Sequence, residues 1–188
     1  KGGKISHVAP NILERQFEVD EPNKVWVTDF TYVRTYEGWL YLTIVLDLFS
    51  RQIIGWSMKN NPRADLVIDA LLMAIWRRKP EGRVLIHSDQ GIQYCSKIYT
   101  NKLKSRNMLI SMTEENHCYE NAQAERVNGI LKTEYYLGLK FDNKCLARRS
   151  CKQAIYLYNS DRPHLSLNMK TPSMVHSNFK ARSIKELN

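Results

Sequence analysis

Three carboxylates in this sequence occur in settings that suit metal-ion chemistry. Asp29 lies within an apolar run, Asp89 directly precedes Gln90-Gly91, and Glu125 follows Asp89 with 35 residues between them. Carboxylates from separate elements can converge on divalent cations and hold them against phosphate, where the metal promotes in-line displacement at phosphorus. The three residues therefore form a candidate metal-binding set for phosphoryl-transfer chemistry.

Each carboxylate also has an ordinary structural explanation when it is considered alone. A strand aspartate such as Asp29 can be satisfied by backbone groups or by an arginine. Asp89 before a glycine fits a turn or a helix cap, and a helical glutamate such as Glu125 is usually exposed and solvated. The sequence motifs around the three residues must decide between these interpretations.

The elements that position the carboxylates follow from hydrophobic periodicity. Val, Ile, Thr and aromatic residues dominate positions 24–59, and breaks at Glu37-Gly38 and Ser50-Arg51 predict three consecutive strands joined by hairpins. A helix follows, with Asn61 as its N-cap and Pro62 at its first position. Further strands are predicted at 84–86 and 108–111, and the helices are predicted at 61–79, 96–106, 119–136 and 143–159. This order predicts an α/β fold with a mixed five-stranded sheet and helices on both faces.

The predicted elements give each carboxylate a position. Asp29 falls inside a strand, whereas Asp89 falls at the carboxyl end of another, where open α/β sheets bind ligands. Glu125 falls in the middle of a helix and shares one face of it with Lys132, because the two residues are two turns apart.

Length and composition predict one main globular domain. The chain has 188 residues, of which 43% are hydrophobic. We predict a linker from an upstream region at 1–22, the catalytic core at 23–160 and an irregular basic tail at 161–188. The longest apolar stretch, 40–49, is far shorter than the roughly 20 residues of a membrane span. The first residues are polar and mixed, unlike a signal peptide. Together with the short apolar stretch, they predict a cytoplasmic protein without membrane contact.

Charge and cysteine usage narrow the class of partner. Residues 1–125 carry 16 Lys/Arg against 15 Asp/Glu, whereas residues 126–188 carry 12 against 4. A basic segment beside an acidic metal site favours a polyanionic substrate, since phosphate neutralisation supplies most nonspecific nucleic-acid affinity. The helix at 143–159 offers a candidate track for the DNA backbone, for which a solvated face is the alternative. Its residues are Lys144, Arg148, Arg149 and Lys152. The four cysteines lack zinc-site spacing and are predicted to be reduced.

Several ordered phrases carry a family resemblance over about residues 22–172. They are Trp26-Val27-Thr28-Asp29-Phe30-Thr31-Tyr32, Leu46-Asp47-Leu48-Phe49-Ser50-Arg51 with Gly55-Trp56, His87-Ser88-Asp89-Gln90-Gly91-Ile92-Gln93-Tyr94, Ser111-Met112, Cys118-Tyr119, Asn121-Ala122, Tyr158-Asn159, Arg162-Pro163-His164, Leu167 and Thr171-Pro172. Together they resemble the DDE transposase core of the insertion-sequence-three family, which is related to retroviral integrases. The interval of 35 residues between Asp89 and Glu125 is a hallmark of that family.

The resemblance implies a ribonuclease-H-like fold and a catalytic, metal-binding triad of Asp29, Asp89 and Glu125. It implies two Mg²⁺ ions in the active complex, for which Mn²⁺ can substitute, and it makes DNA ends and target DNA the partners. Lys132 is then expected to contact DNA near its terminus, and Arg162 and His164 to bind DNA as well. A DNA-recognition domain is expected upstream or in a companion protein, with a homo-oligomer assembling on DNA at the nucleoid.

The resemblance leaves two alternative functions open. A ribonuclease-H-like nuclease that only hydrolyses DNA would share the fold and the metals but would not join strands. A domesticated DNA-binding protein would keep the fold without chemistry, although the intact triad argues against it. The chain also departs from the family at Asn116-His117, where Gly-Asn is usual. Gly reaches backbone angles that Asn116 reaches less easily, so we expect a different shape for the loop before the helix predicted at 119–136.

Overall fold

A central mixed sheet organises the chain. The computed structural model describes residues 8–114 and 118–185. Its main path runs in the order β3-β2-β1-β4-β5. The strands of this path are β1 (Val25–Thr35), β2 (Gly38–Asp47), β3 (Gln52–Lys59), β4 (Leu85–Ser88) and β5 (Leu109–Met112). A two-residue strand, β6 (Lys140–Phe141), adds to β1 in parallel, so the sheet has one strand more than the predicted five.

The first three strands form the predicted meander. β1 and β2 pair antiparallel from Trp26↔Asp47 to Thr35↔Gly38, which leaves a two-residue connection. Gly38 adopts φ of 100°, a conformation that favours glycine. At the other end, the buried Asp47 carboxylate accepts hydrogen bonds from the backbone N–H groups of Asn23 and Ser50, at 2.9 and 3.2 Å. Asp47 therefore stabilises the β2–β3 turn.

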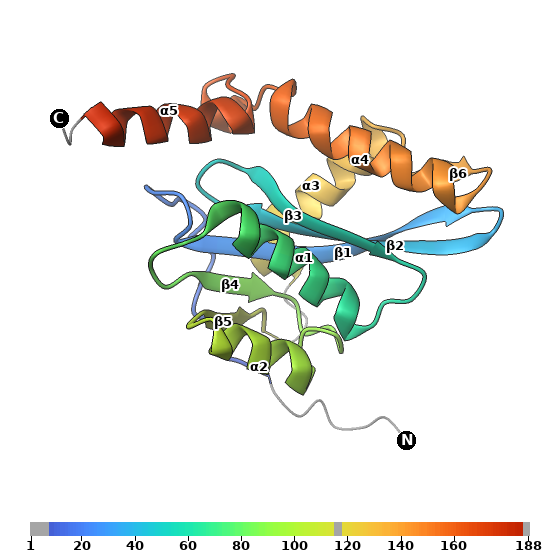
Figure 1. The fold of residues 1–188 in the computed structure, drawn as a ribbon, viewed down its shortest axis with the longest axis horizontal. Coiled ribbons are helices and arrows are strands. Elements are labelled where there is room, and N and C mark those ends of the chain that lie inside the picture. The colour runs from blue at the N-terminus through green and yellow to red at the C-terminus, as the bar shows by residue number, and fades with distance from the viewer. Residues whose placement is uncertain (1–7, 115–117, 186–188) are drawn as a thin grey trace.

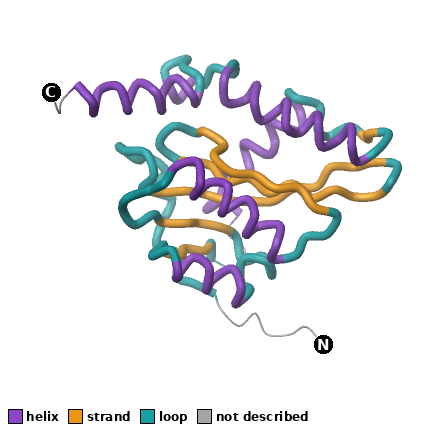
Figure 2. Tube along the Cα trace, in the orientation of Figure 1, coloured by secondary structure: helices purple, strands orange, loops and turns teal. Residues whose placement is uncertain are grey.

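Helices cover both faces of the sheet, as predicted (Figures 1 and 2). On one face, α1 (Ala64–Arg78) and α2 (Lys97–Ser105) form a core with Trp26 and Ile86. On the other face, α3 (Ala122–Thr133) and α4 (Lys144–Ser160) pack over Val27 and Val33. Successive residues of β1 thus point into different cores. This alternation is expected for a strand that is buried on both faces.

The helix α1 lies very close to the sheet at Gly55 of β3. A Cβ atom at this position would lie 2.2 Å from the Ala70 carbonyl oxygen and 2.8 Å from the Ala74 backbone nitrogen. Only glycine lets α1 lie this near the sheet.

The structure corrects the predicted start of the first helix and the predicted C-terminal tail. α1 begins at Ala64 with Arg63 as its N-cap, so Asn61 and Pro62 lie outside it.

The tail at 161–188 was predicted to be irregular, which is wrong for α5 (Pro172–Lys185). The Thr171 hydroxyl oxygen accepts a hydrogen bond from the Met174 N–H at 3.3 Å and caps α5, while Phe179 packs on Phe49 at 5.2 Å. The weak amphipathic pattern of this segment conceals the helix from sequence analysis.

The N-terminal segment packs against the sheet. Leu13 is 3% exposed and belongs to the core, and the Ser111 hydroxyl oxygen accepts hydrogen bonds from the N–H groups of Ile12 and Leu13, at 2.9 and 3.2 Å. The proposed domain limits at 22 and 160 stay predictions. No helix in the described ranges has the length and apolarity that spanning a bilayer requires.

Candidate active site

Asp29 lies where β1 leaves its neighbour β4. The parallel pairing of these two strands covers Val25 to Val27, so Asp29 lies beyond the last paired residue of β1. Its Oδ1 accepts a hydrogen bond from the Phe30 N–H at 2.8 Å, and its Oδ2 accepts one from Asn128 Nδ2 at 2.9 Å. The carboxylate is therefore held between a strand backbone and α3.

Asp89 follows β4 directly, at the carboxyl end of the strand beside β1, as the sequence predicts. Its Oδ1 accepts a hydrogen bond from the Gly91 N–H at 3.0 Å. A Cβ atom at Gly91 would lie 3.0 Å from the same oxygen and 2.8 Å from Gln93 Nε2. The glycine thus leaves room for the turn to close around the carboxylate.

Glu125 lies in the first turn of α3 and is exposed, whereas Ala124, Val127 and Leu131 of the same helix are buried. A 3₁₀ turn, η1 (Cys118–Asn121), precedes α3. Asn121 Nδ2 donates a hydrogen bond to the Thr28 carbonyl oxygen at 3.1 Å and anchors the start of α3 beside β1. The buried stripe of α3 fixes the rotation of the helix and so the direction of Glu125.

Burial and the charge of Asp89 raise the pKa of both other carboxyl groups. Burial, and then the charge of Asp89, raise the pKa of Asp29 to about 6, with a smaller effect from Glu125; hydrogen bonds from Asn128 and Phe30 oppose the rise. Burial raises the pKa of Asp89. Burial and the charge of Asp89 raise the pKa of Glu125. Each carboxylate therefore ionises at a cost that a nearby cation would remove.

The donor set suits a hard divalent cation, because it consists of oxygen ligands only. Beside the carboxylates, the Oδ1 atoms of Asn121 and Asn128 are buried and have no hydrogen-bond partner in the described residues. Within the same residues, no three acidic, imidazole or thiol groups already stand close enough to form a complete ligand cluster. The side chains thus fit a metal ion but would need to adjust around it.

Two family models match the chain. Both carry the description "Integrase core domain", and they match residues 19–118 and 106–172. The chain belongs to the integrase core domain family. The first match contains Asp29 and Asp89, and the second contains Glu125 and the C-terminal signature residues.

Curated relatives of this integrase core are bacterial transposases. It is 44% identical to Transposase InsF for insertion sequence IS3A of Escherichia coli over 158 residues, which cover 84% of this chain and 55% of that protein. It is 36% identical to the transposase of insertion sequence element IS904 of Lactococcus lactis over 173 residues, which cover 92% of this chain and 68% of that protein. The integrase core thus spans about half the length of the InsF relatives.

Solved structures confirm the ribonuclease-H-like fold that the resemblance implies. A chain of the simian T-cell lymphotropic virus intasome matches with a TM-score of 0.69 at 21% identity, over 90% of this chain and 57% of that one. The catalytic core domain of HTLV-2 integrase in complex with magnesium matches with a TM-score of 0.64 at 22% identity, over 82% and 97% of the two chains.

The structure places Lys132 on the predicted side of the integrase core, two helical turns beyond Glu125 on α3. Its Nζ lies 4.3 Å from the centroid of the Tyr32 ring. Of the basic residues predicted on α4, Arg149 and Lys152 are exposed and Lys144 is half-buried. Arg148 binds the sheet, since its Nη1 donates a hydrogen bond to the Met58 carbonyl oxygen of β3 at 2.7 Å.

Arg162 and His164 occupy structural positions. The Arg162 guanidinium donates two hydrogen bonds of 2.7 Å to the Glu134 carboxylate and ties the end of α4 to the end of α3. His164 is 9% exposed and packs edge-on against Tyr158 at 5.1 Å. Burial and nearby arginines lower the pKa of His164 to about 4. A DNA contact by either residue stays a prediction.

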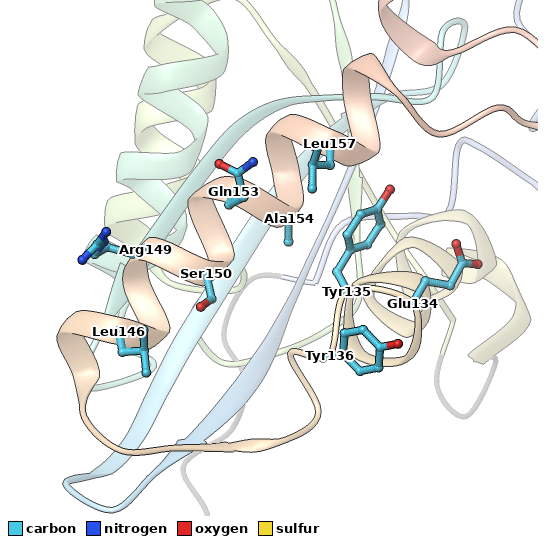
Figure 3. Close-up of a pocket in the computed structure, with 9 residues that line it drawn as sticks. All are labelled: Glu134, Tyr135, Tyr136, Leu146, Arg149, Ser150, Gln153, Ala154 and Leu157. Carbon is cyan, nitrogen blue, oxygen red and sulfur yellow. The ribbon is translucent and has the colours of Figure 1, made fainter.

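A hollow of about 710 Å³ lies between the end of α3 and α4 (Figure 3). Tyr135, Tyr136 and Leu157 line it, and Arg149 projects from its rim away from Tyr135. None of the three carboxylates lines it. The candidate active site therefore lies apart from this hollow.

Sequence analysis missed the residues that support the carboxylates. One is Asn128 of α3, whose amide donates the hydrogen bond that holds Asp29. The Tyr94 hydroxyl, buried 3.2 Å from the Thr28 hydroxyl, was not considered. The sequence signal for Asn128 was its position three residues after Glu125, which makes the two side chains neighbours on a helix. His87 is buried, as expected of a structural histidine, and its Nδ1 lies 2.8 Å from the Ser111 hydroxyl.

Proposed function

We propose that this integrase core is the catalytic part of an insertion-sequence transposase. It would cut DNA at the ends of the element and transfer the new 3′-hydroxyl group to a target phosphodiester. The observation that carries the proposal is the arrangement of the three carboxylates: the Asp29 carboxylate accepts a hydrogen bond from Asn128, which lies one turn beyond Glu125 on α3, and Asp89 follows the strand beside β1. The similarity to IS3 and IS904 transposases supports the same reaction.

The proposed ligands are the three carboxylates, and the proposed metal is Mg²⁺, which Mn²⁺ can replace. Two bound ions would activate the attacking hydroxyl or water and stabilise the leaving 3′-oxygen. Asp29 and Asp89 are held by hydrogen bonds from Asn128 and Gly91, so they are oriented before DNA arrives. Glu125 is exposed and can adjust to the DNA and to the metal. The chain's own contribution is thus orientation and charge, without a covalent enzyme–DNA intermediate.

The proposed partners are element-end DNA, target DNA and a DNA-recognition region outside these residues. The basic excess of residues 126–188 supports contact with DNA, which attracts basic surfaces whatever its sequence. We propose that the core assembles as a homo-oligomer on DNA, because joining two element ends to one target needs more than one active site.

The test is strand transfer from labelled terminal-repeat DNA of the encoding element, with Mg²⁺ or Mn²⁺. The native chain should give nicked and joined products, whereas Asp89→Asn should give at most about one thousandth of either, as expected when a central electrostatic group is lost. Asp142→Asn, at an exposed aspartate beside β6, at the opposite end of β1 from the β4 pairing, is the matched control and should act like the native chain. Equal joining by Asp89→Asn would show that the triad assignment is wrong. Nicking without joining would favour the purely hydrolytic nuclease.

A further inference from the structure

Two exposed tyrosines of the β1–β2 hairpin each carry a lysine ammonium over the ring. Lys132 Nζ lies 4.3 Å from the Tyr32 centroid, and Lys140 Nζ lies 3.7 Å from the Tyr36 centroid. Trp39 meets Tyr32 edge-on, with the centroids 5.0 Å apart. Tyr32, Trp39 and Tyr36 are 51%, 47% and 71% exposed. We call these five residues the aromatic patch.

The aromatic patch begins near the carboxylates. Tyr32 follows Asp29 by three residues of β1, which is about 10 Å at about 3.4 Å per residue. Lys132 follows Glu125 by seven residues of α3, which is also about 10 Å at 1.5 Å per residue. Asp29 shares one face of β1 with the buried Thr31 and Val33, whereas Tyr32 projects to the other, exposed face. The patch therefore adjoins the active site across the edge of β1, at a backbone span of about three nucleotides at about 3.4 Å per nucleotide.

From there the patch leads away along the hairpin. Tyr36 lies in the β1–β2 turn, four residues beyond Tyr32. Figure 1 shows the β1–β2 hairpin reaching past α1 toward β6, the strand that contains Lys140. Between the β4 pairing at Val27 and the β6 pairing at Arg34, no strand within residues 8–114 and 118–185 pairs with this edge of β1. Lys132 reaches the Tyr32 ring at this edge.

The two lysines of the patch have charge available for a ligand. Among the ion pairs of the described residues, none involves Lys132 or Lys140. Lys59, by contrast, is neutralised by Asp65 and Asp69, at 3.0 and 2.7 Å. A ligand that suits the patch presents both flat rings and negative charge.

We propose that the aromatic patch binds unpaired nucleotides of the DNA substrate beside the active site. Bases would stack on Tyr32, Trp39 and Tyr36, while Lys132 and Lys140 would pair with the phosphates between them. Stacking on exposed aromatic rings combined with a basic track is how proteins hold single strands without reading their sequence. The proposal rests on the proposed function in taking DNA as the substrate. It adds that a frayed or displaced strand, rather than intact duplex, occupies this surface.

The first experiment measures fluorescence anisotropy of labelled DNA in EDTA, so that no cleavage occurs. The probes are a blunt duplex and the same duplex with a short single-stranded extension. Tyr32→Ala should weaken binding of the extended duplex about tenfold and binding of the blunt duplex less than about twofold, since one stacked base is lost. Tyr32→Phe should bind both like the native chain. Trp76→Ala, at a tryptophan of α1 that is 74% exposed and lies outside the patch and the basic face of α4, is the control and should also bind like the native chain.

Three outcomes would overturn the proposal. Equal weakening on both duplexes, or no weakening on either, would show that the rings do not hold unpaired bases. A change in oligomeric state with unchanged DNA binding would show instead that the patch is a protein interface. If Tyr32→Ala unfolds, Tyr36→Ala at the hairpin turn replaces it with the same expectation.

A second experiment locates the strand directly. An extension that contains 5-iododeoxyuridine should crosslink on irradiation to Tyr32, Tyr36 or Trp39, and crosslinks confined to other residues would contradict the proposal. Both experiments are independent of metal and carboxylates. A chain that binds the extended duplex through the patch but joins no DNA would therefore contradict only the proposed function, whereas a chain that joins DNA without patch binding would contradict only this inference.

Discussion

The substitution Asp29→Asn should make the metal-free protein more stable at alkaline pH. The pKa of Asp29 is about 6 in the folded chain against an ordinary 3.8, chiefly because of burial and the charge of Asp89. This difference corresponds to about 3 kcal/mol of destabilisation by the ionised carboxylate at pH 8. The folded state binds more protons than the unfolded state between these two pKa values. The penalty therefore grows as pH rises through the window and disappears below it.

Hydrogen bonding reduces the expected gain. The carboxylate accepts from both Phe30 and Asn128, whereas an amide has one acceptor oxygen, so one bond of about 1 kcal/mol is lost. Rotation of the Asn128 amide can restore it, because the Asn128 Oδ1 has no partner among the described residues. We expect a net gain of about 2 kcal/mol at pH 8 and less than about 1 kcal/mol at pH 5.

Urea unfolding in EDTA at both pH values measures this gain. Asp142→Asn, at an exposed aspartate, is the control and should leave the free energy of unfolding unchanged. Adding Mg²⁺ should stabilise the native chain more than the Asp29→Asn variant, because only the former keeps all three carboxylates. No gain at pH 8, or the same gain at pH 5, would refute the assignment of a buried, repelled charge at Asp29.

Three further substitutions test the surrounding structure. Asn128→Ala should lower the free energy of unfolding by about 1–3 kcal/mol at pH 8, because a buried carboxylate loses a donor; a more stable variant would contradict this role. Gly55→Ala should cost about 3 kcal/mol, because its Cβ would overlap α1, whereas Gly82→Ala, with open space around it, should be nearly neutral; equal thermal shifts would argue against the close approach. The pKa of His164 is about 4, below the ordinary 6.5, so the unfolded chain binds more protons as pH falls from 6.5 to 4 and stability declines. His164→Phe should reduce this decline by about 1 kcal/mol after solvent screening, and an unchanged pH dependence of urea unfolding would show that His164 is not responsible.

The positions of the carboxylates could be predicted because each depends on local patterns. Strand residues around Asp29 show the composition of a buried strand, and Asp89 follows a short apolar run before glycine. Glu125 lies on a helix whose apolar positions repeat at helical spacing. The predicted meander and the helices on both faces are confirmed for the same reason.

Interactions between distant segments could not be predicted. The hydrogen bond from Asn128 to Asp29 joins residues 99 positions apart, and nothing in either segment alone requires it. Arg162 and His164 were chosen from a family signature, but the ion pair of Arg162 with Glu134 and the packing of His164 against Tyr158 already account for their positions. β6 is only two residues long, which is too short for a strand pattern to emerge. The altered loop at Asn116-His117 lies outside the described residues.

The buried stripe of α3 has a consequence for how such chains can diverge. Ala124, Val127 and Leu131 fix the phase of the helix, so Glu125 faces the other carboxylates only in that phase. One residue inserted within α3 would turn every later position by about 100°, and it would separate Glu125 from Asn128 and Lys132. An insertion ahead of the helix would preserve the phase. Insertions before Asn121 should therefore be tolerated better than insertions after it, although both change the 35-residue interval between Asp89 and Glu125.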